Sequence, residues 1–262
     1  MSSVSFPKSS EIYPPCFSSS EMEHDDEASS KPFISISSKD WKNPEAFLKK
    51  LPPKPEKLLN FLEGPCPIWG HKRCVAKDSH FVVPLIRNVT IIVNSSPVTE
   101  FLDLVNLDIL DRASGGSGLK FSSYKNEILK TEKNKRYQVL FEWAVMTRTV
   151  LPGTRGMPFN VQEGITEDLG YEVPSVIDAA TCILWEKRCS GSAFYNNNEN
   201  LTFTRCREMI DDCYVEVGGG FSKRGLEIDL SVQEVFMTGM AGIKMFQDRF
   251  YSLKAKKPQA CK

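Results

Sequence analysis

The chain has 262 residues, and its 33 basic side chains equal its 33 acidic ones in number. This balance argues against a nucleic-acid-binding protein, which usually carries a basic excess. No apolar run reaches the length of about 18 residues that predicts a transmembrane helix.

Charge is distributed unevenly along the chain. Residues 1–32 contain two lysines and six acids and are rich in serine and proline, a composition that favours disorder. From Met240 onward, six basic side chains accompany one acid, Asp248. We therefore expect a disordered acidic tail at 1–32, a globular domain at 33–253 and a basic tail at 254–262. The basic end is either a solvated terminus or a contact for a membrane surface or an acidic partner.

The N-terminus lacks the basic and then apolar order of a secretory signal. A chain of this length does not need disulfides to fold, so its eight cysteines are expected to be reduced thiols in a cytoplasmic protein.

Proline and glycine divide the first half of the domain into short elements. Helices are expected from about 38 to 50, interrupted at Asn43-Pro44, and from 55 to 63. An irregular loop at 66–77 precedes strands at 79–86 and 90–93.

Two further helices are expected before the middle of the chain. Ser96-Pro97 has the residue types of a helix start, with serine as the cap and proline in the first turn. Phe101, Leu104 and Val105 would supply its buried stripe. The second of these helices is expected at 121–133.

The second half alternates strongly apolar segments with polar turns. Residues 137–147 predict a central strand that carries Trp143, and helices are expected at 158–169 and 174–189. Alternating apolar residues predict a hairpin of 213–217 with 226–230, with glycines 218–220 in its turn, and a final helix is expected at 232–253. This order lacks βαβ regularity, which favours an α+β fold: one globular domain with a mixed or antiparallel sheet flanked by helices.

Cys66, His71, Cys74 and His80 fall within fifteen residues and are residue types that bind zinc. A zinc-stabilised module is therefore one alternative. Their spacing lacks a Cys-x-x-Cys pair, so loop thiols beside a histidine at the edge of a strand explain them as well. We expect no cofactor.

A cysteine-dependent hydrolase or transferase is another alternative, because His71 or His80 could serve as a base for a thiol. The glycine-rich segments 115–120 and 218–225 lack the Gly-Lys-Ser/Thr that ends a Walker loop. The acids Glu216, Glu227 and Asp229 share the polar face of the expected hairpin and are either an acid–base group or a solvated surface.

Arginines follow two of the expected strands. Arg148 and Arg155 come after the Trp143 strand, and Arg205 follows a short strand near 203. Guanidinium groups suit carboxylate or phosphate ligands, although they also tie loops together. Our leading hypothesis is a non-enzymatic binding protein for a protein partner or an anionic ligand, with Trp143, Arg148, Arg155 and Arg205 as the binding residues.

Several segments of the domain form a set in a fixed order: Gly64–Trp69, Trp143–Thr147 with Val150–Arg155, Tyr171–Ala180, Thr202–Cys206 and Val217–Phe221. In sequence and in order, this set resembles uncharacterised proteins of chlamydia-related bacteria that live in amoebae. The resemblance covers about residues 40–250 and implies a bacterial protein, one that is exported into a host cell as an effector. The serine-rich tail is compatible with a type III secretion signal. The resemblance implies no activity.

Overall fold

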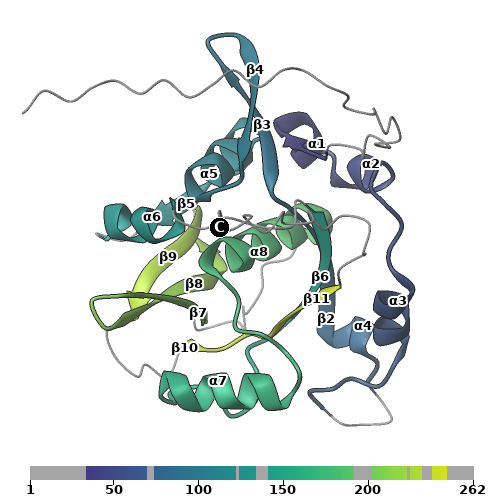
Figure 1. Cartoon of the computed structure of the whole chain (residues 1–262), viewed down its shortest axis with the longest axis vertical. Coiled ribbons are helices and arrows are strands. Elements are labelled where there is room, and N and C mark those ends of the chain that lie inside the picture. The colour runs from purple at the N-terminus through teal and green to yellow at the C-terminus, as the bar shows by residue number, and fades with distance from the viewer. Residues whose placement is uncertain are drawn as a thin grey trace, which may run out of the picture. The chain divides into compact units, whose positions relative to one another are not determined.

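The computed structural model describes residues 34–69, 74–121, 124–133, 141–191, 202–222, 225–231 and 238–246 (Figure 1). The chain divides into two units between Pro32 and Phe33, and all described residues belong to the second unit. They form eight helices and eleven strands, which confirms the expected α+β fold.

The helices are short except for the last. They are α1 (Ser38–Lys42), α2 (Pro44–Leu48), α3 (Glu56–Glu63), α4 (Ala76–Ser79), α5 (Leu104–Ala113), α6 (Lys125–Lys133), α7 (Phe159–Asp168) and α8 (Val176–Ser190). None of the helices in the described ranges is long and apolar enough to span a bilayer.

The strands form three sheets. The first has the order β1-β3-β4, the second β10-β7-β8-β9-β5 and the third β11-β6-β2. Their bounds are β1 (Ile36–Ser37), β2 (His80–Ile86), β3 (Asn88–Val93), β4 (Ser96–Phe101), β5 (Leu119–Phe121), β6 (Phe141–Thr147), β7 (Phe203–Ile210), β8 (Cys213–Ser222), β9 (Gly225–Ser231), β10 (Thr238–Gly239) and β11 (Ile243–Phe246).

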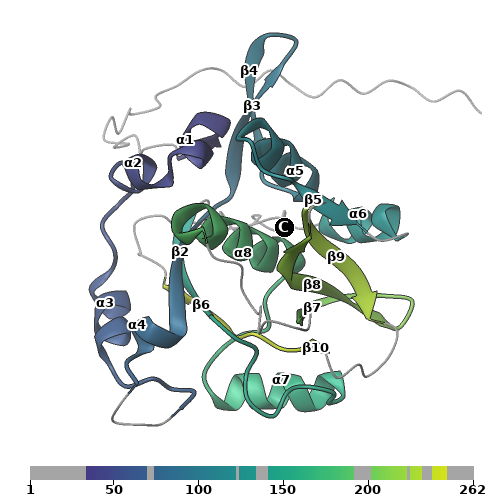
Figure 2. The ribbon, with the colours of Figure 1, turned by 180° about the vertical axis from the view of Figure 1, so that it is seen from behind.

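Helix α8 lies at the centre of the fold. Every residue from Val176 to Glu186 is buried, as expected for a helix covered on all sides. It packs against β2 on one side and against β7 and β8 on the other (Figure 2). The Ser175 hydroxyl caps its first turn, and Gly191, with φ of 71°, ends it as expected from the sequence.

The expected central strand around Trp143 is confirmed as β6 over 141–147, and its expected first part, 137–140, lies outside the described residues. It pairs antiparallel with β2, where Trp143 lies opposite Pro84, and antiparallel with β11, where Trp143 lies opposite Phe246. All seven residues of β6 are buried, so the strand is covered on both faces. The loop that follows β6 consequently leaves from a rigid part of the core.

The expected hairpin is also confirmed, as β8 and β9, with Val217 opposite Ile228. The glycines at 218–220 belong to β8, so their placement in the turn was wrong. The pairing of β8 with β9 shifts in register between Val217 and Phe221, and the glycines lie within this shift. A Cβ added at Gly218 would lie 3.1 Å from the Phe203 ring, which explains the absence of a side chain there.

The expected helix start at Ser96-Pro97 was wrong, because these residues begin strand β4. Asn94 and Ser95 have φ of 48° and 67° and join β3 to β4 as a two-residue turn of the type that matches strand twist. Helix α5 starts later, where the Asp103 carboxylate accepts from Asn106 N.

The expected final helix was wrong at 238–246, where the chain forms β10 and β11. A Cβ added at Gly239 would lie 2.8 Å from Val150, and one added at Gly242 would lie 2.7 Å from Tyr171. The glycines therefore let the chain pass closely beside these side chains. The rest of the expected helix, 232–237 and 247–253, lies outside the described residues.

Candidate functional site

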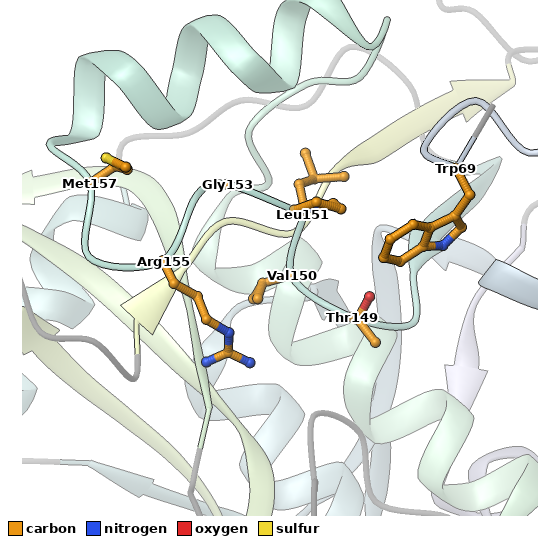
Figure 3. Close-up of a pocket in the computed structure, with 8 residues that line it drawn as sticks. Trp69, Thr149, Val150, Leu151, Gly153, Arg155 and Met157 are labelled. Carbon is orange, nitrogen blue, oxygen red and sulfur yellow. The ribbon is translucent and has the colours of Figure 1, made fainter.

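A pocket of about 370 Å³ opens beside the loop that joins β6 to α7 (Figure 3). All but one of its lining residues come from this loop, and Trp69 comes from the segment after α3. The lining residues are Trp69, Thr149, Val150, Leu151, Pro152, Gly153, Arg155 and Met157. A volume of this size falls in the usual range for small-molecule sites, roughly 300–1,000 Å³.

The buried hydroxyl of Thr154 fixes the conformation of this loop. Thr154 Oγ1 donates to Leu151 O at 2.7 Å and accepts from Met240 N at 3.1 Å. The Thr154 carbonyl accepts from Gln162 Nε2, on α7, at 2.5 Å. One fully buried residue thus links the loop to the segment after β10 and to helix α7.

Backbone hydrogen bonds hold the rest of the loop. Leu151 N donates to Met240 O at 2.8 Å, and Gly156 N donates to Thr238 O at 3.2 Å. Because these bonds engage the main chain, the loop is ordered before any ligand binds, and pre-ordering lowers the entropy cost of binding.

Arg155 supplies positive charge to the pocket. Its side chain is exposed, and Nη2 donates to Thr202 Oγ1 at 3.1 Å. That is its one hydrogen bond to another described residue, and it forms no ion pair within the described ranges. A guanidinium carries five N–H donors, so most of them remain available to a ligand.

Apolar surface surrounds this charge. Trp69 is 45% exposed and Met157 is 41% exposed, although large apolar side chains are commonly buried. Figure 3 shows the Trp69 ring beside Thr149 at one end of the loop and Met157 at the other. The pocket can therefore hold a ligand that combines an apolar group with an anionic end.

Three of the four predicted binding residues lie elsewhere and have partners within the fold. Trp143 is buried and donates to Pro52 O at 3.3 Å. Arg148 donates to His80 O at 3.1 Å and pairs with Glu186. The buried Arg205 donates to Met157 O at 2.9 Å, so it helps to hold the pocket loop in place. The structure does not bring these three side chains together with Arg155.

A second polar group contains two of the other candidates, Cys66 and His80. Cys66 Sγ lies 2.9 Å from Ser79 Oγ, and Ser79 Oγ lies 2.9 Å from His80 Nδ1. His80 Nδ1 also lies 2.8 Å from Ala76 O, and Nε2 lies 2.6 Å from the Tyr171 hydroxyl. The helical turn of α4 places Ser79 between the thiol and the imidazole.

The protonation of His80 follows from these partners. A carbonyl oxygen can only accept, so Nδ1 carries the proton and donates to Ala76 O. Nε2 then accepts from Tyr171, whose pKa burial raises. Burial lowers the pKa of His80, with a further contribution from the charge of Arg148. The imidazole is therefore neutral, and neither nitrogen can take a proton from Cys66.

The metal alternative has no support among these side chains. No group of three or more histidine, cysteine, aspartate or glutamate side chains in the described ranges could hold a metal ion. His71 lies outside the described residues, so its pairing with a thiol or a metal stays a prediction.

The glycine segment at 115–118 packs closely against the protein. Gly118 N donates to Asp111 Oδ2 at 2.9 Å, and Arg188 pairs with the same carboxylate. A Cβ added at Gly116 would lie 2.0 Å from Asp111 Oδ2. This segment therefore has a structural role.

The acids of the β8–β9 hairpin are also engaged. Glu216 accepts from the Thr238 hydroxyl at 2.9 Å, and Glu227 pairs with Lys120 at 2.5 Å. Asp229 accepts from Leu230 N at 2.8 Å. Each of the three acids therefore has a partner within the protein, and their presence needs no acid–base reaction to explain it.

Comparisons with protein-family models, with curated proteins and with solved structures find no match. The resemblance to proteins of chlamydia-related bacteria and the export that it implies stay predictions.

Trp69, Thr154 and Met157 were not predicted from the sequence as parts of a site. Two features of the sequence could have pointed to them: Trp69 lies in a proline-rich loop, and Thr154 lies within the turn at Pro152–Arg155.

Proposed function

We propose that the chain is a binding protein whose pocket takes a carboxylate ligand with an adjacent apolar group. The observation that supports this most is the exposed Arg155 guanidinium in the wall of a pocket whose other walls are mainly apolar. The pairing matches the chemistry of a carboxylate attached to an aromatic or aliphatic group, as at the C-terminus of a peptide with an apolar last residue.

A carboxylate suits this pocket better than a phosphate does. Phosphate sites usually combine several cations with backbone N–H groups at a helix start or in a glycine-rich turn. Here one guanidinium serves the pocket, and the backbone N–H groups of Leu151, Thr154 and Gly156 are already bonded within the protein. A planar carboxylate can accept two parallel hydrogen bonds from a single guanidinium.

The apolar walls give the second element of recognition. The indole of Trp69 offers a flat surface for an aromatic ring. Met157 has a flexible, polarisable side chain that adapts to irregular shapes. Specificity would therefore favour ligands with a ring or a branched chain next to the carboxylate.

Fluorescence titration of the full chain with N-acetyl-phenylalanine and with its amide tests this proposal. The two probes differ in charge and share their apolar group. Of the four tryptophans, Trp41, Trp143 and Trp185 are buried, so quenching of exposed tryptophan reports on Trp69. We expect the acid to bind more tightly than the amide.

Two variants assign the difference to Arg155. Arg155→Met keeps the apolar stem and removes the charge. A charge-assisted hydrogen bond contributes about 1.5–3 kcal/mol, so affinity for the acid should fall roughly 10- to 100-fold and match that for the amide. Arg112→Met removes an exposed guanidinium that pairs with Asp108 on α5, and it should leave the affinity unchanged. Equal binding of acid and amide to the wild type would contradict the proposal.

A further inference from the structure

Cys66 and Cys74 lie directly opposite each other on two short extended segments. Pro65 and Val75 form an antiparallel bridge, and Cys66 N donates to Cys74 O at 2.9 Å beside it. Residues that face each other across such a bond have Cα atoms about 5.5 Å apart. Disulfides span Cα separations of roughly 4.4–6.8 Å, so this backbone pairing brings the two residues within the range that a disulfide spans.

Both side chains carry free thiols, and each thiol influences the pKa of the other. Cys66 is buried, whereas Cys74 is partly exposed. The pair therefore has one thiol that a reagent can reach and a second thiol directly behind it.

The surroundings of the two thiols favour different protonation states. Burial alone would raise the pKa of Cys66, but hydrogen bonds from the Ser79 hydroxyl and the backbone N–H groups of Trp69 and Ile68 lower it. Burial and the neighbouring Cys66 raise the pKa of Cys74. Cys66 is accordingly the better nucleophile of the pair near neutral pH.

We propose that Cys66 and Cys74 are a redox-active dithiol that a small disulfide, such as glutathione disulfide, converts to an intramolecular disulfide. In the first step the Cys74 thiolate attacks one sulfur of the small disulfide, forms a mixed disulfide and releases one thiolate. In the second step the Cys66 thiolate attacks the Cys74 sulfur and releases the second thiolate. Two protein thiols are oxidised, and one disulfide is reduced to two thiols.

The second step explains why Cys66 can be buried. It attacks a neighbouring sulfur, so it needs no solvent access. Ser79 acts as a positioning residue, because its hydroxyl stabilises the Cys66 thiolate. This proposal is independent of the ligand that the Arg155 pocket takes.

The test incubates the full chain with glutathione disulfide, blocks the remaining thiols and maps the cysteines by mass spectrometry. The wild type should contain a Cys66–Cys74 disulfide and carry no glutathione on Cys74. Cys66→Ser should retain glutathione on Cys74, because the second step is lost. Cys189→Ser, at an exposed thiol at the end of α8, should behave as the wild type. Wild-type protein that retains glutathione on Cys74 would overturn the proposal.

A second variant keeps both thiols and therefore tests the proposal if Cys66→Ser does not fold. Ser79→Ala removes the hydroxyl and should raise the pKa of Cys66. A rise of one pKa unit lowers the thiolate fraction about tenfold, and the gain in intrinsic nucleophilicity recovers roughly a factor of three. Disulfide formation from the mixed disulfide should slow about threefold near neutral pH and exceed the wild-type rate roughly threefold at a pH that ionises the Cys66 thiol in both proteins. An unchanged rate at neutral pH would count against the assigned role of Cys66.

Discussion

Replacement of Arg87 by methionine should destabilise the fold strongly. Arg87 is 5% exposed, and its guanidinium pairs with Asp178 at the start of α8 and with Glu142 on β6, the latter at 2.8 Å. Its loss leaves two buried carboxylates without this cation, and breaking a buried pair costs about 3–5 kcal/mol. The Ser175 hydroxyl still donates to Asp178, so the loss should lie near the lower end of that range.

Urea denaturation measures this loss as a change in the free energy of unfolding. Lys50→Met is the matched control, because it breaks an ion pair with Asp40 in which the lysine is 68% exposed, and exposed pairs contribute at most about 1 kcal/mol. Adding Glu142→Gln and Asp178→Asn to Arg87→Met should recover part of the lost stability. A loss for Arg87→Met as small as that for Lys50→Met would refute the reasoning.

Three further variants test the core and helix α7. The pKa of His80 is lowered from 6.5 by burial, so below that pH the unfolded chain binds a proton that the folded chain does not. The free energy of unfolding should therefore fall as pH drops below about 6.5, by at most roughly 1.4 kcal/mol per pH unit, and His80→Gln should flatten this dependence in urea titrations. Gly242→Ala should cost about 1–3 kcal/mol through contact with Tyr171. Gly164→Ala in α7, where a Cβ meets open space, should instead stabilise the helix by roughly 0.5–1 kcal/mol in the same assay.

The elements that the sequence predicted well carry strong local signals. The buried run of β6 and the capped, apolar helix α8 were identified because burial and capping are visible in adjacent residues. The β8–β9 hairpin was identified from its alternating apolar residues.

The errors arose where long-range contacts outweigh local preference. Ser96-Pro97 favours a helix start, but pairing with β3 across the Asn94-Ser95 turn makes it a strand. The residues from Thr238 to Phe246 have apolar side chains at helical spacing, yet they pair with β7 and β6, which are distant in the chain. Neither pairing can be read from a local pattern.

The candidate site was predictable only in part for the same reason. Arg155 was selected as a binding residue because a loop after a buried strand commonly carries function. The structure places it in the wall of a pocket, and its binding role stays a prediction. The sequence could not distinguish Arg148 and Arg205 from Arg155 as binding residues, because only the fold shows that Arg148 and Arg205 have partners within the protein. Trp69 reaches the pocket from a segment about eighty residues earlier in the sequence, which no spacing rule predicts.

The most direct test of the binding role is a nitrogen–proton NMR titration with N-acetyl-phenylalanine. We predict that the side-chain N–H signals of Trp69 and Arg155 both shift as the probe concentration rises, while the indole signal of the buried Trp185 stays in place. If neither the Trp69 nor the Arg155 signal moves, or if all indole signals move alike, the assignment of a carboxylate site to this pocket is contradicted.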